Sequence, residues 1–132
     1  MIKYQIRGWL PEILFASVLR NGKGEKMTVS EILKVVDTLK ANTLDDEIKL
    51  GWINEVEGRL FYEINKSSHQ DYAPIRSLSD TLSVSEPYSR MYVLYLVAMI
   101  AFSLGQYDTF SMSMGEFEKA VEEYAKYVIR NR

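Results

Sequence analysis

The chain contains no cysteine, one histidine and three prolines in 132 residues. The lack of cysteine excludes a disulfide-stapled scaffold, cysteine zinc sites, iron–sulfur centres and thiol nucleophiles. His69 alone cannot supply a site that needs two imidazoles, and it lies in a serine-rich stretch where we expect it to be exposed to solvent. These absences remove several enzyme classes without naming a function.

The chain also lacks a strong charge of either sign, since its formal net charge is −2 at pH 7. This charge balance gives no excess of basic residues that would indicate nucleic-acid binding. The charge is uneven along the sequence: residues 1–26 contain five basic and two acidic groups, whereas residues 27–132 contain eleven and sixteen. Hydrophobic residues make up 47% and charged residues 26%, as in an ordinary globular domain.

Residues 1–26 are predicted to be an N-terminal extension that precedes a helical domain at residues 27–132. A charged stretch broken by glycines, residues 20–26, separates the two, and Met27 opens a good helix start. A purine-rich coding sequence for residues 23–26 would look like a bacterial ribosome-binding site, so we hypothesise that Met27 is the biological start. The alternative is a genuine arm in which residues 11–19 form a short helix packed on the domain.

An all-α fold is expected, a small four-helix bundle with a long loop between the second and third helices. Thr28 and Glu31 form a capping box for the first helix. Thr43 and Asp46 are expected to cap the second, which runs to about Lys66. Its inward positions are predicted from helical spacing to be Ile48, Trp52, Val56, Leu60 and Ile64, with Ile53 and Phe61 widening the face.

The loop at residues 67–87 interrupts the helical pattern. Pro74 blocks a helix there, and residues 82–84 alternate as a short strand would, so one small hairpin is possible within the loop. The third helix is predicted to begin at Pro87 and to end at Gly105. Residues 91–104 are apolar on almost every side but too few to span a bilayer, so we expect a buried central helix rather than a membrane segment.

The fourth helix is expected to start with Asp108 as its N-cap. Apolar residues recur along it in alternating steps of four and three, at Phe110, Met114, Phe117, Val121, Tyr124 and Val128. This seam indicates one helix of an intramolecular bundle, with a seam between subunits as the alternative. The chain ends in a short basic tail of Arg130, Asn131 and Arg132.

The sequence contains no pair of carboxylates placed for acid and base catalysis and no glycine-rich loop that would bind phosphate. Pairs such as Glu55 and Glu57 point in different directions on a helix, so they do not converge as an acid and a base, whereas Glu55 and Arg59 have the spacing of a surface ion pair. Gly51 and Gly58 lie on one side of the second helix, where each costs up to ~1 kcal/mol relative to alanine. We therefore expect another backbone to approach them closely, from within the chain or from a neighbouring subunit.

Two stretches resemble a known family. Residues 49–58, within the helical stretch 44–62, fit the pattern K-x-x-W-[IL]-N-E-V-E-[GA], and residues 87–96 fit P-Y-x-x-x-Y-x-x-Y-L. Tyr107-Asp108 and residues 112–117 continue the likeness, which covers about Met27 to Tyr127 in order. The chain is thus similar to the head–tail connector (adaptor, or head-completion) proteins of tailed phages and prophages from Gram-positive hosts. The family pattern usually begins near the equivalent of Met27, which agrees with an extension at residues 1–26.

The resemblance implies a mainly helical structural subunit that is not an enzyme and needs no cofactor or metal. Its implied partners are the portal protein, a tail-completion or stopper protein and sister copies in a ring, commonly of twelve, in the virion neck after assembly in the bacterial cytoplasm. DNA would pass through the lumen without specific binding, which an acidic domain suits, and no membrane is involved. The alternative is another helical phage assembly or regulatory interaction module without enzymatic activity.

Two surfaces and the basic tail are the predicted contacts in such an assembly. A ring needs head-to-tail contacts between two different patches of the subunit. The glycine side of the second helix and the aromatic surface of the third are the candidate patches, and family analogy directs the tail toward the portal. The residues are Gly51, Gly58, Tyr88, Tyr92, Tyr95, Arg130 and Arg132.

Overall fold

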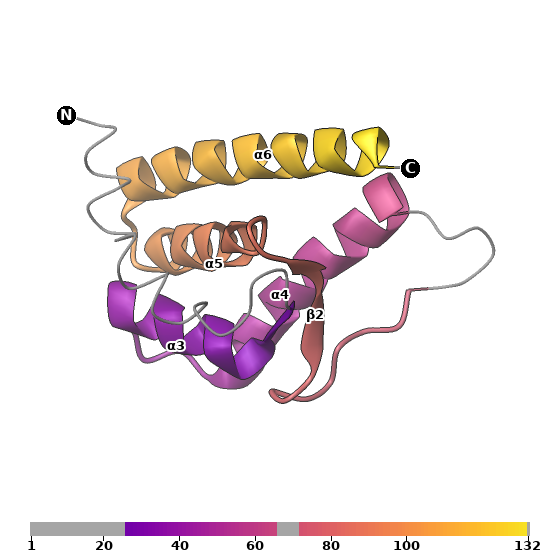
Figure 1. Ribbon diagram of the computed structural model, residues 1–132. Coiled ribbons are helices and arrows are strands. Elements are labelled where there is room, and N and C mark those ends of the chain that lie inside the picture. The colour runs from indigo at the N-terminus through magenta and orange to yellow at the C-terminus, as the bar shows by residue number, and fades with distance from the viewer. Residues whose placement is uncertain (1–25, 66–71, 132) are drawn as a thin grey trace.

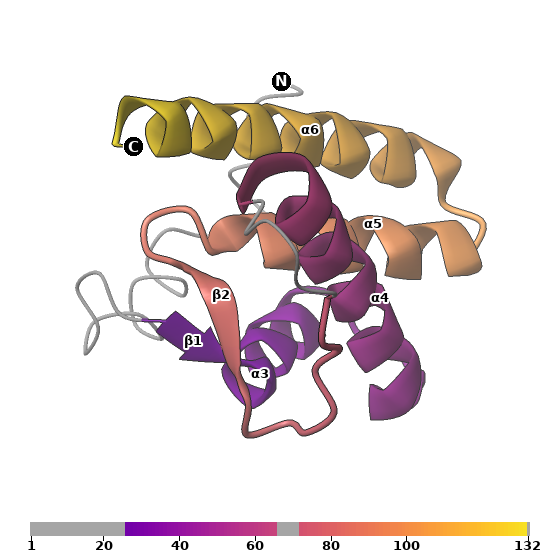
Figure 2. The same cartoon turned by 90° about the vertical axis from the view of Figure 1, so that its right-hand side faces the viewer.

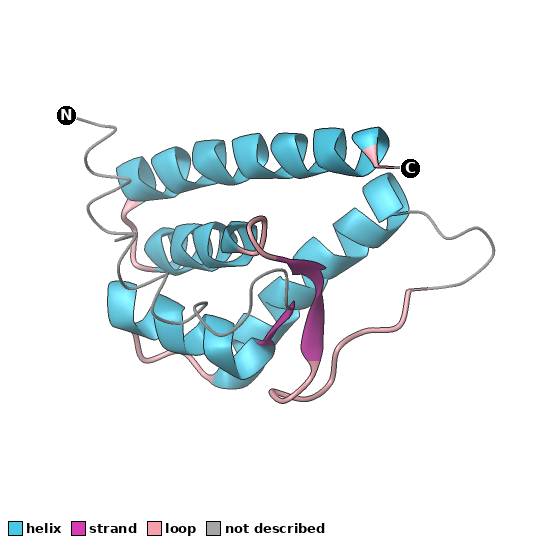
Figure 3. Ribbon diagram, in the orientation of Figure 1, coloured by secondary structure: helices cyan, strands magenta, loops and turns pink. Residues whose placement is uncertain are grey.

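The computed structural model describes residues 26–65 and 72–131, and this part of the chain is mostly helical (Figure 1, Figure 3). Its elements are, in chain order, β1 (Lys26–Thr28), α3 (Val29–Leu39), α4 (Asp46–Leu60), the π-helical turn η1 (Phe61–Asn65), β2 (Thr81–Ser85), α5 (Arg90–Ser103) and α6 (Tyr107–Arg130). The expectation of a mainly helical domain is confirmed. The predicted extension, apart from Lys26, and His69 lie outside the described residues.

Helix α5 is the centre of the core. It is buried along nearly all its length, from Met91 to Ala101, as its unbroken apolar sequence predicts. Helix α6 lies along one side of α5, and α3 and α4 pack on other sides (Figure 1, Figure 2). The seam of α6 faces this core with its middle positions, since Phe117, Val121 and Tyr124 are buried. The seam is therefore an intramolecular one in this chain.

Two helix ends agree with the sequence. The Glu31 amide donates to Thr28 Oγ1 at 3.2 Å and the Thr28 amide donates to Glu31 Oε1 at 2.9 Å, which is the predicted capping box of α3. Gly105 follows α5 with φ of +75°, a left-handed conformation that glycine adopts without steric cost.

Three helix starts differ from the prediction. Asp45, not Thr43, precedes α4, and its side chain makes no capping bond. Helix α5 begins at Arg90 rather than Pro87, because residues 86–89 form a turn in which the Tyr88 amide donates to the Ser85 carbonyl. Helix α6 begins one residue before Asp108, with the Gln106 carbonyl accepting from the Phe110 amide.

The strand at residues 82–84 exists, but its partner lies elsewhere than expected. Instead of a hairpin within the loop, β2 pairs antiparallel with β1, which directly precedes α3 (Figure 2). Lys26 lies opposite Ser85 and Thr28 opposite Thr81, with an irregular register between the two pairs. The small sheet buries Met27, Leu82 and Val84 against the core, and this burial holds the start of the domain to the loop before α5.

The buried face of α4 is rotated by about one residue from the predicted face. Ile53, Val56, Leu60 and Ile64 are buried as expected, but Ile48 is exposed and Trp52 is only partly buried. The position that continues the buried row at the start of the helix is occupied by Lys49, which is 2% exposed and pairs with Asp37 at 2.9 Å. Sequence spacing places charged residues outward by default, so it misses a buried charge that has a partner.

Candidate functional site

The second half of α4 organises the segment that follows it. The Asn54 side-chain oxygen accepts from the Ile75 amide at 2.8 Å and from the Tyr72 hydroxyl at 2.5 Å, and the Asn54 amide group donates to the Ile75 carbonyl at 2.9 Å. Three hydrogen bonds from one side chain thus hold residues 72–75 against the helix. Sequence reasoning had no signal for this role, because the partners are 18 and 21 residues away.

Glu57 is a buried residue of α4 that holds β2 against this helix by hydrogen bonds. It is 5% exposed, and its two oxygens accept from the Ser83 amide at 2.9 Å, the Ser83 hydroxyl at 2.8 Å and the Tyr92 hydroxyl at 2.6 Å. The Tyr92 oxygen accepts in turn from the Val84 amide at 3.2 Å. Two side chains therefore bond the middle of β2, in addition to its pairing with β1. The helical spacing of Glu57 from Ile53 was the one available signal of its burial.

The three tyrosines predicted as a contact surface have three different environments. Tyr92 is fully buried and bonded to Glu57, which corrects its assignment to an exposed patch. Tyr95 is partly buried. The centroid of its ring lies 4.9 Å from that of Phe117, and its hydroxyl donates to Glu55 at 2.6 Å. Tyr88 is partly buried in the turn that precedes α5. The aromatic surface expected as a contact patch is thus not one surface.

Tyr88 belongs instead to a cluster of three tyrosine rings at the C-terminal end of α6. Its centroid lies 5.6 Å from that of Tyr124 and 4.8 Å from that of Tyr127. Tyr124 is buried and donates to Asn65 at 3.0 Å, whereas Tyr127 is substantially exposed. The cluster joins α6 to the start of α5 and keeps an aromatic ring at the surface.

The phenols of this region act as hydrogen-bond donors, not as bases. Burial, reinforced by the charge of Glu57, raises the pKa of Tyr72 to about 12 and that of Tyr92 well above its usual range. Burial and the bond to Glu55 raise the pKa of Tyr95 as well. At neutral pH all three keep their protons and donate them in hydrogen bonds, Tyr92 and Tyr95 to the carboxylates of Glu57 and Glu55, and Tyr72 to the side-chain oxygen of Asn54. The arrangement supports structure, not proton abstraction.

The two α4 glycines do not lie under another backbone within the described residues. A Cβ on Gly51 would meet no described heavy atom within 4 Å, and one on Gly58 would meet only the Tyr72 ring at 3.8 Å, an ordinary contact. The expected close approach within the chain is therefore absent from the described part. An approach from a neighbouring subunit stays a prediction. Arg130 lies exposed in the last turn of α6, and Arg132 is outside the described residues.

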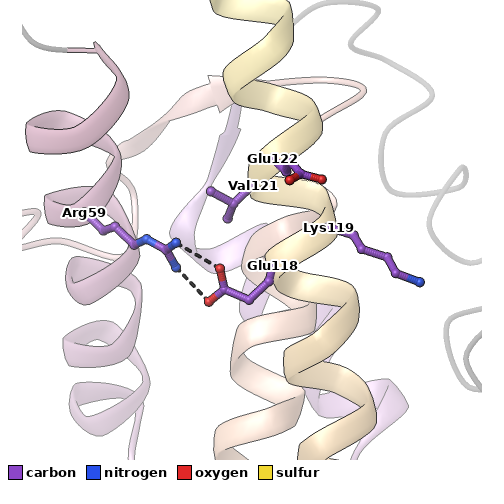
Figure 4. A pocket seen from close by; sticks show the side chains of 5 residues that line it. All are labelled: Arg59, Glu118, Lys119, Val121 and Glu122. Atoms are coloured by element: carbon purple, nitrogen blue, oxygen red, sulfur yellow. Dashed lines mark hydrogen bonds and ion pairs between the residues drawn. The ribbon is translucent and has the colours of Figure 1, made fainter.

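An open pocket lies between α4 and α6, and an ion pair spans it (Figure 4). Both terminal nitrogens of Arg59 donate to Glu118, each at 2.9 Å, and the guanidinium lies 5.7 Å from the centre of the Phe117 ring. The bond from Arg59 lowers the pKa of Glu118. Arg59 also bonds Glu63 at 3.2 Å, not the predicted Glu55, whose carboxylate is engaged by Tyr95.

Apolar side chains are exposed at the turn between α5 and α6. Phe102, Leu104 and Tyr107, which we call the α5–α6 tip, are each at least half exposed. The Phe102 ring lies 5.5 Å from that of Tyr107 and 5.0 Å from that of Phe110 between centroids, so the aromatic rings at the tip form one cluster. Exposed clusters of this kind are typical of interaction surfaces. The tip was not among the predicted contacts.

Comparison with protein families, with curated proteins and with solved structures gives no match. In residues 26–65 and 72–131, no three His, Asp or Glu side chains gather closely enough to hold a metal ion. No helix in the same residues is both long and apolar enough to cross a membrane.

Proposed function

We propose that this chain is a structural head–tail connector subunit of a tailed phage or prophage. In this proposal α3 to α6 form the bundle of one subunit, and copies assemble as a ring beneath the portal in the virion neck. The ring extends the DNA channel and docks the stopper or tail-completion protein. The family is suggested by the resemblance at residues 44–62, 87–96, 107–108 and 112–117.

One observation carries the proposal: Asn54, Glu55 and Glu57 of the first resembling stretch serve architecture, while apolar residues at the turn between α5 and α6 stay exposed. Asn54, Glu55 and Glu57 each bond a different later segment of the chain, at Ile75, Tyr95 and Ser83. Motif residues that hold the fold together fit a protein that functions through its surfaces. The α5–α6 tip is such a surface, rich in the aromatic residues that protein interfaces favour.

The test is to mix the purified full chain with a purified portal protein encoded near it and to image the particles by electron microscopy. We expect an additional ring of density on the portal. A variant with Phe102→Ser and Leu104→Ser tests whether the α5–α6 tip contributes, and Ser111→Ala, at an exposed polar position, is its matched control. Portals that remain bare with wild-type chain at saturating concentration would overturn the proposal.

A second function, a helical assembly or regulatory module outside the neck, shares the same exposed surfaces. It differs in its partner, because such a module would bind a tail or regulatory protein and leave the portal bare. The imaging experiment therefore separates the two.

A further inference from the structure

Two corners of the molecule carry opposite charges and exposed apolar residues. At the acidic corner, Asp45, Asp46 and Glu47 are exposed at the start of α4, beside Ile48, which is 44% exposed. At the basic corner, which is residues 126–130 at the end of α6, Lys126 and Arg130 are exposed, beside Tyr127 and Ile129 at 41% and 63%. Each corner thus combines one sign of charge with an apolar group.

None of these five charged side chains makes an ion pair with another described residue. Acidic groups at a helix start and basic groups at a helix end suit the helix dipole, which accounts for their sign. The dipole does not account for Ile48 and Ile129, whose apolar surface is left in water. At both corners an exposed isoleucine lies beside charged side chains, and this combination points to a contact with another molecule.

The two corners cannot meet within one molecule. They lie diagonally across it in both views, since α4 begins at the edge farthest from α6, whereas α6 ends on the opposite side (Figure 1, Figure 2). A two-fold contact of either corner with itself would place like charges against each other, which is unfavourable. Opposite charges meet only when the acidic corner of one copy faces the basic corner of the next.

We propose that the occupant of each corner is the other corner of a second copy of this chain. Asp45, Asp46 and Glu47 then face Lys126 and Arg130 of the neighbouring copy, and Ile48 packs beside Ile129. Such a head-to-tail contact is heterologous and generates a closed ring if its rotation closes, or an open helix if it does not. The inference rests on the proposed function, because it names the subunit contact that the ring requires.

The absence of cysteine from the chain makes a clean cross-linking test possible. Ile48→Cys and Ile129→Cys are prepared separately in the full chain, at exposed positions where the change does not open the core. Each variant alone, and the two mixed, are concentrated at low ionic strength and oxidised. We expect the mixture to form at least about tenfold more disulfide dimer than either variant alone, because only the mixture brings unlike corners together.

Two controls sharpen the result. A mixture of Ile48→Cys with Ser111→Cys, an exposed position at neither corner, should stay at the background level. Adding Arg130→Glu to the Ile129→Cys chain should lower the mixed dimer by about threefold to tenfold through charge repulsion, and Asp46→Lys in the partner should restore it. As much dimer from either variant alone as from the mixture, or a mixture no better than the control with Ser111→Cys, would overturn the inference.

The outcome is separable from that of the portal experiment. A ring on the portal without cross-linking between Ile48→Cys and Ile129→Cys would keep the connector function and reject this contact. Specific cross-linking with bare portals would keep the contact and reject the connector function.

Discussion

Two interfaces of this small domain are built from different chemistry. Helix α6 is held on α5 by apolar side chains at regular helical spacing, with Phe117 at the centre. The segment from Tyr72 to Ser85 is held on α4 largely by polar side chains, above all Asn54 and Glu57. The first interface is non-directional and gains its free energy from area removed from water, whereas the second depends on a few bonds of fixed geometry. A single substitution should therefore disturb them differently.

The largest effect is expected at the apolar interface. Phe117→Ala removes a ring that is 1% exposed, so the free energy of unfolding should fall by ~3–5 kcal/mol. Phe117→Leu is the matched control and should lose much less, because the volume is mostly kept. Urea unfolding followed by circular dichroism measures both, and equal losses for the two variants would show that the ring is not the anchor of α6.

The polar interface is tested by Glu57→Ala. The change leaves the Ser83 amide, the Ser83 hydroxyl and the Tyr92 hydroxyl without their acceptor, and the expected cost is roughly 2–4 kcal/mol. Glu57→Gln keeps the shape and one acceptor oxygen, and it should cost less. Hydrogen exchange at Ser83 and Val84 should accelerate more than exchange in α6; uniform acceleration across the chain would contradict a local clamp.

Asn54→Ala should have a smaller and more local effect. It removes three hydrogen bonds from a partly buried site, for a loss of roughly 1–2 kcal/mol. Limited proteolysis after Arg76 should become faster, while Asn54→Asp, which keeps the acceptor, should be cut at an intermediate rate. Unchanged cleavage in Asn54→Ala would mean that the segment at 72–76 is held by other contacts.

The outer face of α4 offers a change in the opposite direction. Gly51→Ala should raise the free energy of unfolding by up to ~1 kcal/mol, because glycine is a poor helix former and no described atom lies where the new methyl group would be. Thermal unfolding of the isolated chain measures the gain. A loss of stability would reveal a contact at Gly51, and a stable variant that fails to form the ring on portals would support the predicted subunit approach there.

The smallest effect concerns the ion pair between Arg59 and Glu118, which both retain contact with solvent. Because Arg59 lowers the pKa of Glu118, the pair stabilises the folded state above the ordinary carboxyl range, and this contribution is lost as the pH falls through the lowered pKa. Glu118→Gln should cost less than about 1 kcal/mol at neutral pH. Its stability and that of the wild type should converge once the pH has fallen below the lowered pKa of Glu118, and a difference that persists in strong acid would indicate another role for Glu118.

Much of the fold could be predicted from neighbouring residues. The four helices, the capping box at Thr28, the glycine end of α5 and the seam of α6 follow from spacing within one or two turns. The errors are concentrated where a residue has a distant partner. The rotated face of α4 follows from Lys49 and Glu57 being buried with partners, and β2 pairs with β1 because residues some 55 positions away lie beside it.

The candidate surfaces were less predictable than the fold. Tyr88, Tyr92 and Tyr95 were expected to form one contact patch in a ring, but burial separates them, because Tyr92 has Glu57 as an internal partner. The α5–α6 tip was missed because an apolar residue next to a turn looks the same in sequence whether it faces the core or the solvent. Exposure is a property of the whole packed chain.

The order of residues alone determined that four helices form, which one is central, and two of their ends, the capping box that starts α3 and the glycine that ends α5, because capping and amphipathic spacing act over a few positions. Tertiary structure alone decided which carboxylates are buried, which strand pairs with β2 and which apolar side chains are left at the surface. Those outcomes depend on the desolvation of each group and on the partner that compensates it, and that partner is brought into place only when distant segments pack together.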